Sequence, residues 1–94
     1  MRVSVRFFTS LREITGRKEE VVVFQGRRKV SVRDVLDRLC RRFGRDFVDY
    51  VFNADSGEVR GFLQFLVNGV SVSGLDVVLG DGDVLAIVPP VGGG

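Results

Sequence analysis

The sequence contains no histidine, no tryptophan and a single cysteine in 94 residues. Without histidine, the chain cannot form a serine–histidine–aspartate triad or a zinc site of the usual histidine and cysteine kind. One cysteine also excludes an internal disulfide. No pair of carboxylates stands in a recognisable acid–base context. We therefore expect that the chain is not an enzyme on its own and holds no metal ion.

Long apolar runs and a large net charge are missing as well. No stretch approaches the ~18 apolar residues that a membrane span needs, and the N-terminal residues alternate charged and apolar side chains. Fourteen Lys and Arg against twelve Asp and Glu leave a net charge of +2, so we interpret the arginines of residues 27–45 as a solvated face. We expect a cytoplasmic protein that binds neither nucleic acid nor a membrane.

The hydrophobic residues that are present follow the periods of strands and of one helix. Residues 2–8 alternate apolar and polar side chains, which predicts a half-buried strand, and the valine-rich residues 19–24 predict a second. Between them, residues 9–18 have room for a helical turn but not for a full helix. Two antiparallel strands at the start of the chain are the expected result.

The clearest helix is predicted to follow Ser31 and to span about three turns. Its apolar residues recur at helical spacing and form one stripe: Val32, Val35, Leu36, Leu39, Cys40 and Phe43. Ser31 and Asp34 resemble a capping box, and Arg41 and Arg42 lie at the end that the helix dipole favours for cations. Cys40 lies on the stripe, so core packing is favoured over a reactive thiol.

The second half of the chain predicts further strands and turns. Residues 45–61 match neither period and are left unassigned, apart from a turn at residues 53–57. Strands are expected at residues 62–67, 70–72 and 84–88, with a type I′ turn at Asn68-Gly69 and turns at residues 74–79 and 81–82. The element order predicts an α+β, β-grasp (ubiquitin-like) fold, with a mixed sheet of four to five strands and one main helix.

Three glycines end the chain, after a strand and two prolines. We expect residues 1–90 to form the β-grasp domain and residues 91–94 to form a flexible tail, since glycine loses the most backbone entropy on ordering. Fully extended, that tail reaches ~13 Å. Its carboxyl group, with a typical pKa of ~3.3 to 3.7, is a poor electrophile until it is activated. A frayed, idle end is the alternative interpretation.

Several motifs resemble the MoaD/ThiS family of ubiquitin-like sulfur carriers, above all MoaD, the small subunit of molybdopterin synthase. The resemblance covers nearly the whole chain and rests on these segments: Arg6-Phe7-Phe8, residues 11–16, Leu66-Val67-Asn68-Gly69, residues 79–84, Pro89-Pro90-Val91 and Gly93-Gly94. Residues 45–61 look longer than in compact members.

The resemblance implies that Gly94 is adenylated and then converted to a thiocarboxylate, with Gly93 as the slender residue beside it. It implies no bound cofactor, ATP and Mg²⁺ used by an activating enzyme of the MoeB/ThiF kind, and a MoaE-like large subunit in a heterotetramer. Matching family positions also imply a partner-binding surface that comprises Phe8, Val88, Pro89, Pro90, Val91 and Gly92.

Alternatives remain open at this stage. The same activated glycine could be joined to lysines of other proteins, or its sulfur could serve thiamine synthesis or tRNA thiolation. A non-covalent β-grasp binding module with an idle tail is a further alternative. Phe62 and Phe65 could extend the docking surface, although core packing is favoured for Phe65, while for Phe8 core packing and docking are evenly balanced.

Overall fold

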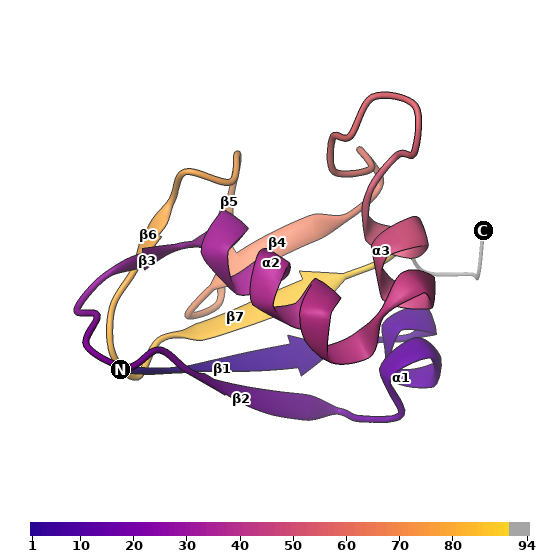
Figure 1. Cartoon of the computed structure of the whole chain (residues 1–94). Helices are drawn as coiled ribbons and strands as arrows, with labels where there is room; N and C mark the ends of the chain where they lie inside the picture. Colours follow the sequence, from indigo (N-terminus) through magenta and orange to yellow (C-terminus); the bar gives the residue numbers. More distant parts are fainter. Residues whose placement is uncertain (91–94) are drawn as a thin grey trace.

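The computed structural model describes residues 1–90 (Figure 1). The elements in chain order are β1 (Arg2–Phe7), α1 (Ser10–Thr15), β2 (Glu19–Val23), β3 (Val30–Ser31), α2 (Val32–Phe43), α3 (Arg45–Val51), β4 (Gln64–Val67), β5 (Val70–Val72), β6 (Val78–Leu79) and β7 (Val84–Val88). None of the helices within residues 1–90 is long and apolar enough to cross a membrane.

The main sheet has five strands in the order β2-β1-β7-β4-β5. The first and last strands, β1 and β7, are parallel neighbours in its middle, while the other pairs are antiparallel. Figure 1 shows α2 running across one face of this sheet. The predicted β-grasp arrangement, a mixed sheet covered by one main helix, is confirmed.

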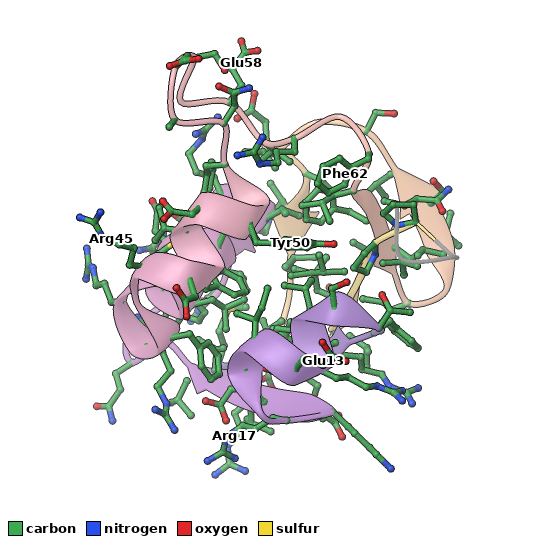
Figure 2. The ribbon with its side chains drawn as sticks, turned by 90° about the vertical axis from the view of Figure 1, so that its right-hand side faces the viewer. Glu13, Arg17, Arg45, Tyr50, Glu58 and Phe62 are labelled. Carbon is green, nitrogen blue, oxygen red and sulfur yellow. The ribbon has the colours of Figure 1, made fainter. Side chains whose placement is uncertain are left out.

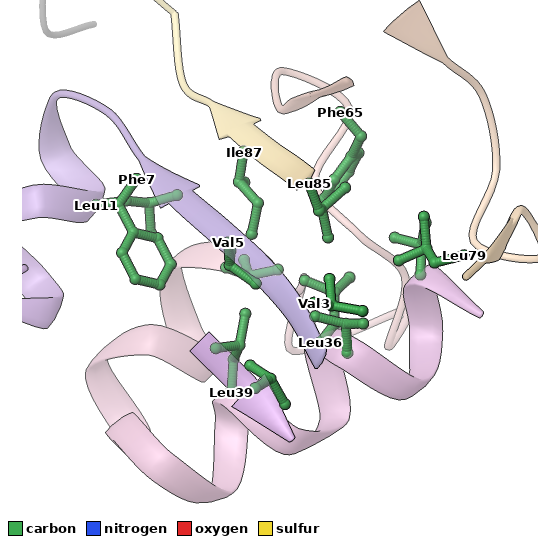
Figure 3. Close-up of a cluster of buried hydrophobic side chains, with 14 of the residues drawn as sticks. Val3, Val5, Phe7, Leu11, Leu36, Leu39, Phe65, Leu79, Leu85 and Ile87 are labelled. Carbon is green, nitrogen blue, oxygen red and sulfur yellow. The ribbon is translucent and has the colours of Figure 1, made fainter. Parts of the chain in front are cut away.

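The core lies between the sheet and the helices. Strand alternation directs every second residue toward α2, so Val3, Val5 and Phe7 of β1 are fully buried, as are Leu85 and Ile87 of β7. Leu36 and Leu39 of α2 point toward these strands in Figure 3. The apolar stripe predicted from helical spacing is therefore the face that α2 buries, with Cys40 and Phe43 partly buried at its edge.

The predicted start of α2 is confirmed in detail. The Asp34 amide donates to the Ser31 hydroxyl at 3.1 Å, and the Ser31 amide donates to the Asp34 carboxylate at 2.9 Å. These reciprocal bonds satisfy donors that a helix N-terminus otherwise leaves free. The type I′ hairpin turn is also confirmed, since both Asn68 (φ 51°) and Gly69 (φ 83°) have positive φ.

Several elements differ from the sequence-based expectation. Residues 10–15 form the complete short helix α1, where only a turn was expected, and residues 45–51 of the unassigned segment form α3. Part of the expected turn at residues 74–79 is the strand β6, which pairs with β3 in a separate two-stranded sheet. Strand β4 begins at Gln64 instead of residue 62, and β1 and β2 end one residue earlier than expected.

Candidate functional site

The described part of the candidate site is the end of β7. Val88 is half-buried, Pro89 is buried and Pro90 is exposed. The predicted tail, which comprises Val91, Gly92, Gly93 and Gly94, lies outside the described residues. The site described below is therefore the surface from which that tail continues.

Strand pairing fixes the position of this chain exit. Ile87 lies opposite Phe7 of β1, and Val88 lies opposite Gln64 of β4. Proline has no amide hydrogen to donate to a sheet ladder, so the strand ends at Pro89. Because β1 and β7 are parallel, Pro90 lies at the same end of the molecule as the carboxyl end of β1.

Phe8 is the first residue beyond β1 and lies next to the chain exit. It is half-buried, with the Arg6 guanidinium 5.8 Å and the Arg12 guanidinium 5.3 Å from its ring centre. The Arg12 Nε donates to the Phe7 carbonyl at 2.9 Å, which holds that side chain in place. Phe8 is thus an aromatic surface flanked by two cations, an arrangement that the strand alternation of residues 2–8 did not reveal.

The backbone that follows Phe8 is strained. Thr9 has φ 47° and ψ −120°, values that a β-branched residue rarely adopts. The Leu11 amide donates to the Phe8 carbonyl at 3.0 Å and closes a tight turn into α1. The turn directs the chain into α1 directly after Phe8.

The sheet face opposite α2 carries an apolar strip that leads to the chain exit. Leu66 of β4 lies opposite Ala86 of β7, and all three of Leu66, Ala86 and Val88 are half-exposed. Arg6 lies opposite Ala86 on the other side. We call Leu66, Ala86 and Val88 the outer-face strip. The strand period alone places Ala86 and Val88 on one face of β7, but only the register of β4 and β7 shows that Leu66 lies beside them.

Tyr50 and Phe62 form an aromatic pair at the same end of the molecule. Their ring centres are 5.7 Å apart, and Figure 2 shows Tyr50, from α3, next to Phe62, which precedes β4. Phe62 is 47% exposed, whereas Phe65 is only 6% exposed. The interpretation of Phe65 as a core residue is confirmed, and Phe62 remains available for docking.

Cys40 does not belong to this site. The thiol is half-buried against the core on α2. Burial, and secondarily the nearby Asp37 carboxylate, raise the pKa of the Cys40 thiol above its ordinary value. A raised pKa leaves less of the reactive thiolate at neutral pH, so the side chain packs as a small apolar residue.

The chain exit offers the chemistry of a contact surface. Within residues 1–90, no group of three or more potential ligand side chains could hold a metal ion. The surroundings instead offer half-exposed apolar side chains and the two cations beside Phe8, which suit contact with another protein.

Known proteins share this architecture. The sequence model of the ThiS family matches residues 5–94. Small archaeal modifier protein 3 from Haloferax volcanii is 33% identical over 101 positions that cover 100% of both chains. The crystal structure of SAMP1 from Haloferax volcanii is similar with a TM-score of 0.83 and 30% identity, also over 100% of both chains. A putative molybdopterin converting factor, subunit 1, from Pyrococcus furiosus is 32% identical with a TM-score of 0.70, over 96% of this chain and 98% of that one.

Proposed function

The chain belongs to the ThiS family of ubiquitin-like sulfur carriers and modifiers, and from that premise we propose that it acts through activation of its terminal carboxylate on Gly94. Residues 1–90 serve as the body that partners recognise, and residues 91–94 serve as the tail that enters their active sites. The observation that carries the proposal is the placement of the β7 end. The last described residue is exposed beside an apolar strip and a cation-flanked phenylalanine.

The tail is suited to this role because glycines lack the Cβ atoms that would obstruct a narrow channel. From Val91 to Gly94 it can extend ~13 Å beyond the body. Phe8, Val88 and Pro90 then contact the partner near the channel entrance, together with Val91 and Gly92, while the buried Pro89 holds the end of β7 in this surface. Gly93 passes through the channel and Gly94 carries the reacting group.

Activation takes place in two steps on an enzyme of the MoeB/ThiF kind that binds ATP and Mg²⁺. A Gly94 carboxylate oxygen attacks the α-phosphorus of ATP, which releases pyrophosphate and leaves an acyl-adenylate. A sulfide-level nucleophile then attacks the acyl carbon, so that a C–S bond forms and the C–O bond to AMP breaks. The products are AMP and a terminal thiocarboxylate.

Our first assignment for that thiocarboxylate is sulfur donation in molybdenum or tungsten cofactor synthesis. The chain would be the small subunit of a molybdopterin synthase heterotetramer and would insert its tail into a MoaE-like large subunit. The likeness to the putative molybdopterin converting factor subunit supports this assignment. The terminal glycines also support it, because a segment without side chains would let the sulfur on Gly94 enter a narrow active site.

Protein modification is a second assignment with its own support. The relatives from Haloferax volcanii are named as small archaeal modifier proteins, and their likeness covers all of this chain. In that role an acceptor lysine amine attacks the activated Gly94 carbonyl, the activating group leaves, and an isopeptide bond forms. Both assignments require the same activated glycine and differ only in the final acceptor.

Intact-mass measurement tests the shared step. The chain is incubated with a matched activating enzyme, ATP, Mg²⁺ and sulfide, and we expect a gain of about 16 Da as one oxygen is replaced by sulfur. A variant that lacks Gly93 and Gly94 should keep its fold by circular dichroism and gain no mass. Equal function of the intact and shortened chains in cells would show a non-covalent module instead, and would contradict the proposal.

The two assignments separate in a second stage. The thiocarboxylated chain is given either a MoaE-like subunit with a pterin precursor or a lysine-containing protein mixture with the activating enzyme. Dithiolene formation with return of the original mass supports the sulfur donor. A covalent adduct whose cross-linked peptide contains Gly94 supports the modifier.

A further inference from the structure

A second candidate interaction surface lies at the free edge of β2, which β1 separates from β7. The Phe24 amide donates to the Met1 carbonyl at 2.9 Å, the Met1 ammonium donates back to the Phe24 carbonyl at 2.9 Å, and the Phe7 amide donates to the Lys18 carbonyl at 2.9 Å. Because antiparallel hydrogen-bonding partners alternate, Val22 and Glu20 also face β1. The amide and carbonyl groups of Val21 and Val23 therefore point away from the sheet.

This edge lacks two of the features that usually protect edge strands, proline and lysine, although Glu19 and Glu20 begin the strand. Residues 19–23 contain no proline and no lysine, and the strand is five residues long, against three for β5 at the other edge. The Val21 and Val23 side chains are 51% and 42% exposed. The part of this edge that carries the exposed side chains of Val21 and Val23 is a template for another strand.

A groove runs beside this edge. It has a volume of about 310 Å³ and lies between β2 and α2, which Figure 1 shows passing near each other. Buried Val22 and Leu39 form its apolar floor, while Glu20, Arg38 and Arg42 form its rim. Side chains of an added strand would point alternately into this groove and onto the exposed valines. Both faces of such a strand would meet apolar surface, so its preferred sequence is a short aliphatic run.

The charges around the groove favour an acidic partner. The Glu20 carboxylate forms ion pairs with two guanidinium groups, that of Arg17 at 3.5 Å and that of Arg42 at 3.1 Å. Arg38 forms no ion pair among residues 1–90. Its guanidinium donates to the outward-facing Val23 carbonyl at 2.7 Å and lies over the Phe24 ring. The Val23 end of the edge therefore carries an arginine without an ion pair, whereas Glu20 is already paired and the exposed Glu19 lies at the other end of β2. Asp37 lines the adjacent hollow.

We propose that the edge of β2 and its groove bind an extended peptide segment of a partner protein, in which a short aliphatic run is followed by carboxylates. The peptide adds as a strand to Val21 and Val23. Its own amide takes the place of the Arg38 guanidinium at the Val23 carbonyl, and one of its carboxylates receives the displaced arginine. The surface is separate from the outer-face strip, so a partner can be held here whether or not Gly94 is activated.

Titration with a synthetic peptide tests the proposal. The probe is acetyl-Val-Ile-Val-Ile-Asp-Glu-Asp-amide, added to the full-length ¹⁵N-labelled chain and followed by NMR. We expect the largest shifts in β2 and the adjoining face of α2, with slowed hydrogen exchange at the Val21 and Val23 amides. A peptide with three lysines in place of the acids should bind roughly tenfold or more weakly, the loss expected for about one charge-assisted hydrogen bond.

Two pairs of variants make the test specific. Val21→Pro removes an outward-facing amide and should abolish binding, while Ser71→Pro makes the same change on the opposite edge strand, β5, and should not. Arg38→Glu should weaken binding roughly tenfold, while Arg33→Glu, on the other side of α2, should leave it unchanged. The Arg38→Glu and Arg33→Glu variants keep the test valid if a proline variant fails to fold.

Several results would overturn the proposal. Shifts confined to Leu66, Ala86 and Val88 would place the peptide on the outer-face strip. Equal affinity of the acidic and the lysine peptide would contradict the assigned acidic partner. Equal loss of peptide affinity in both members of either pair of variants would contradict binding at the β2 edge. Dimerisation of the free chain that Val21→Pro abolishes, seen by sedimentation, would show that the edge pairs with a second copy instead.

Discussion

At the scale of single residues, carboxylates stabilise the fold by accepting backbone hydrogen bonds at turns and helix ends. The backbone hydrogen bond from Ser31 lowers the pKa of Asp34, and the backbone hydrogen bond from Gly80 lowers that of Asp83. A lowered pKa in the folded state means that the stabilisation is present above the ordinary value of 3.8 and is lost as the pH falls through the folded-state pKa. Acid should therefore loosen the start of α2 and the loop before β7.

Replacing Asp34 by alanine tests this linkage. We expect the variant to lose about 1 kcal/mol of unfolding free energy at pH 7, because the helix start loses half of its capping box. The difference from the parent chain should shrink as the pH falls below 3.8 and through the lowered folded-state pKa of Asp34, where the carboxylate of the folded parent chain becomes protonated. Urea unfolding at pH 7 and pH 3 measures both quantities. Asp37→Ala, an exposed change on the same helix, is the control and should show neither effect.

Cys40 gives a second prediction at this scale. Because the pKa of the Cys40 thiol is raised, iodoacetamide at pH 8 should alkylate Cys40 more slowly than an exposed cysteine. The comparison is Ser56→Cys in a Cys40→Ala background, since Ser56 lies in an exposed turn. The Cys40→Ala chain should also gain thiocarboxylate as fully as the parent. Rapid labelling of Cys40 would contradict its assignment to packing.

At the scale of elements, α3 is held by aromatic packing. Phe47 is fully buried, with its ring centre 6.3 Å from that of Phe7 and 5.9 Å from that of Phe43. Phe47→Ala should cost about 3 to 5 kcal/mol, since it removes a large buried side chain and leaves a cavity. Phe62→Ala, at a 47% exposed position, should cost about 1 kcal/mol or less, the scale of one aromatic pair. Thermal and urea unfolding measure both.

The elements also show how far sequence reasoning extends. Helix α2 was predictable because its apolar stripe and its capping residues indicate the same helix with the same start. Helix α3 was not, since it has only seven residues and follows Gly44, which offers no side-chain cap. Strand β6 has two residues and exists only through its pairing with β3, which lies far away in the sequence. Short elements that depend on tertiary contacts leave no periodic signal.

The candidate site, like the fold, was only partly predictable from the sequence. Phe8 and Val88 were identified through a family resemblance, and their positions are consistent with an exposed docking surface. The outer-face strip could not be predicted without knowing which strands are neighbours, because Leu66 and Ala86 meet only through the register of β4 and β7. The two arginines beside the Phe8 ring likewise became visible only in the structure. Local pattern predicts which face a residue occupies but not which residue lies opposite it.

At the scale of the whole molecule, the body and the tail should be energetically independent. Truncation after Pro90 leaves every described core residue in place, so the midpoint of thermal unfolding should stay within about 2 °C of the parent value, the shift that a change of roughly 0.5 kcal/mol produces. Differential scanning calorimetry measures this midpoint. A loss of several degrees would show that the tail packs on the body and would weaken the division at residue 90.

The parallel pairing of β1 with β7 has a consequence for how the protein is made. The strand at the centre of the sheet is the last to leave the ribosome, so the nascent chain cannot close its core until synthesis is nearly complete. Translation that stops early yields a chain without its middle strand, which proteases can remove. A chain that stops before β7 cannot complete the folded body, so an activating enzyme that recognises this body would not meet it.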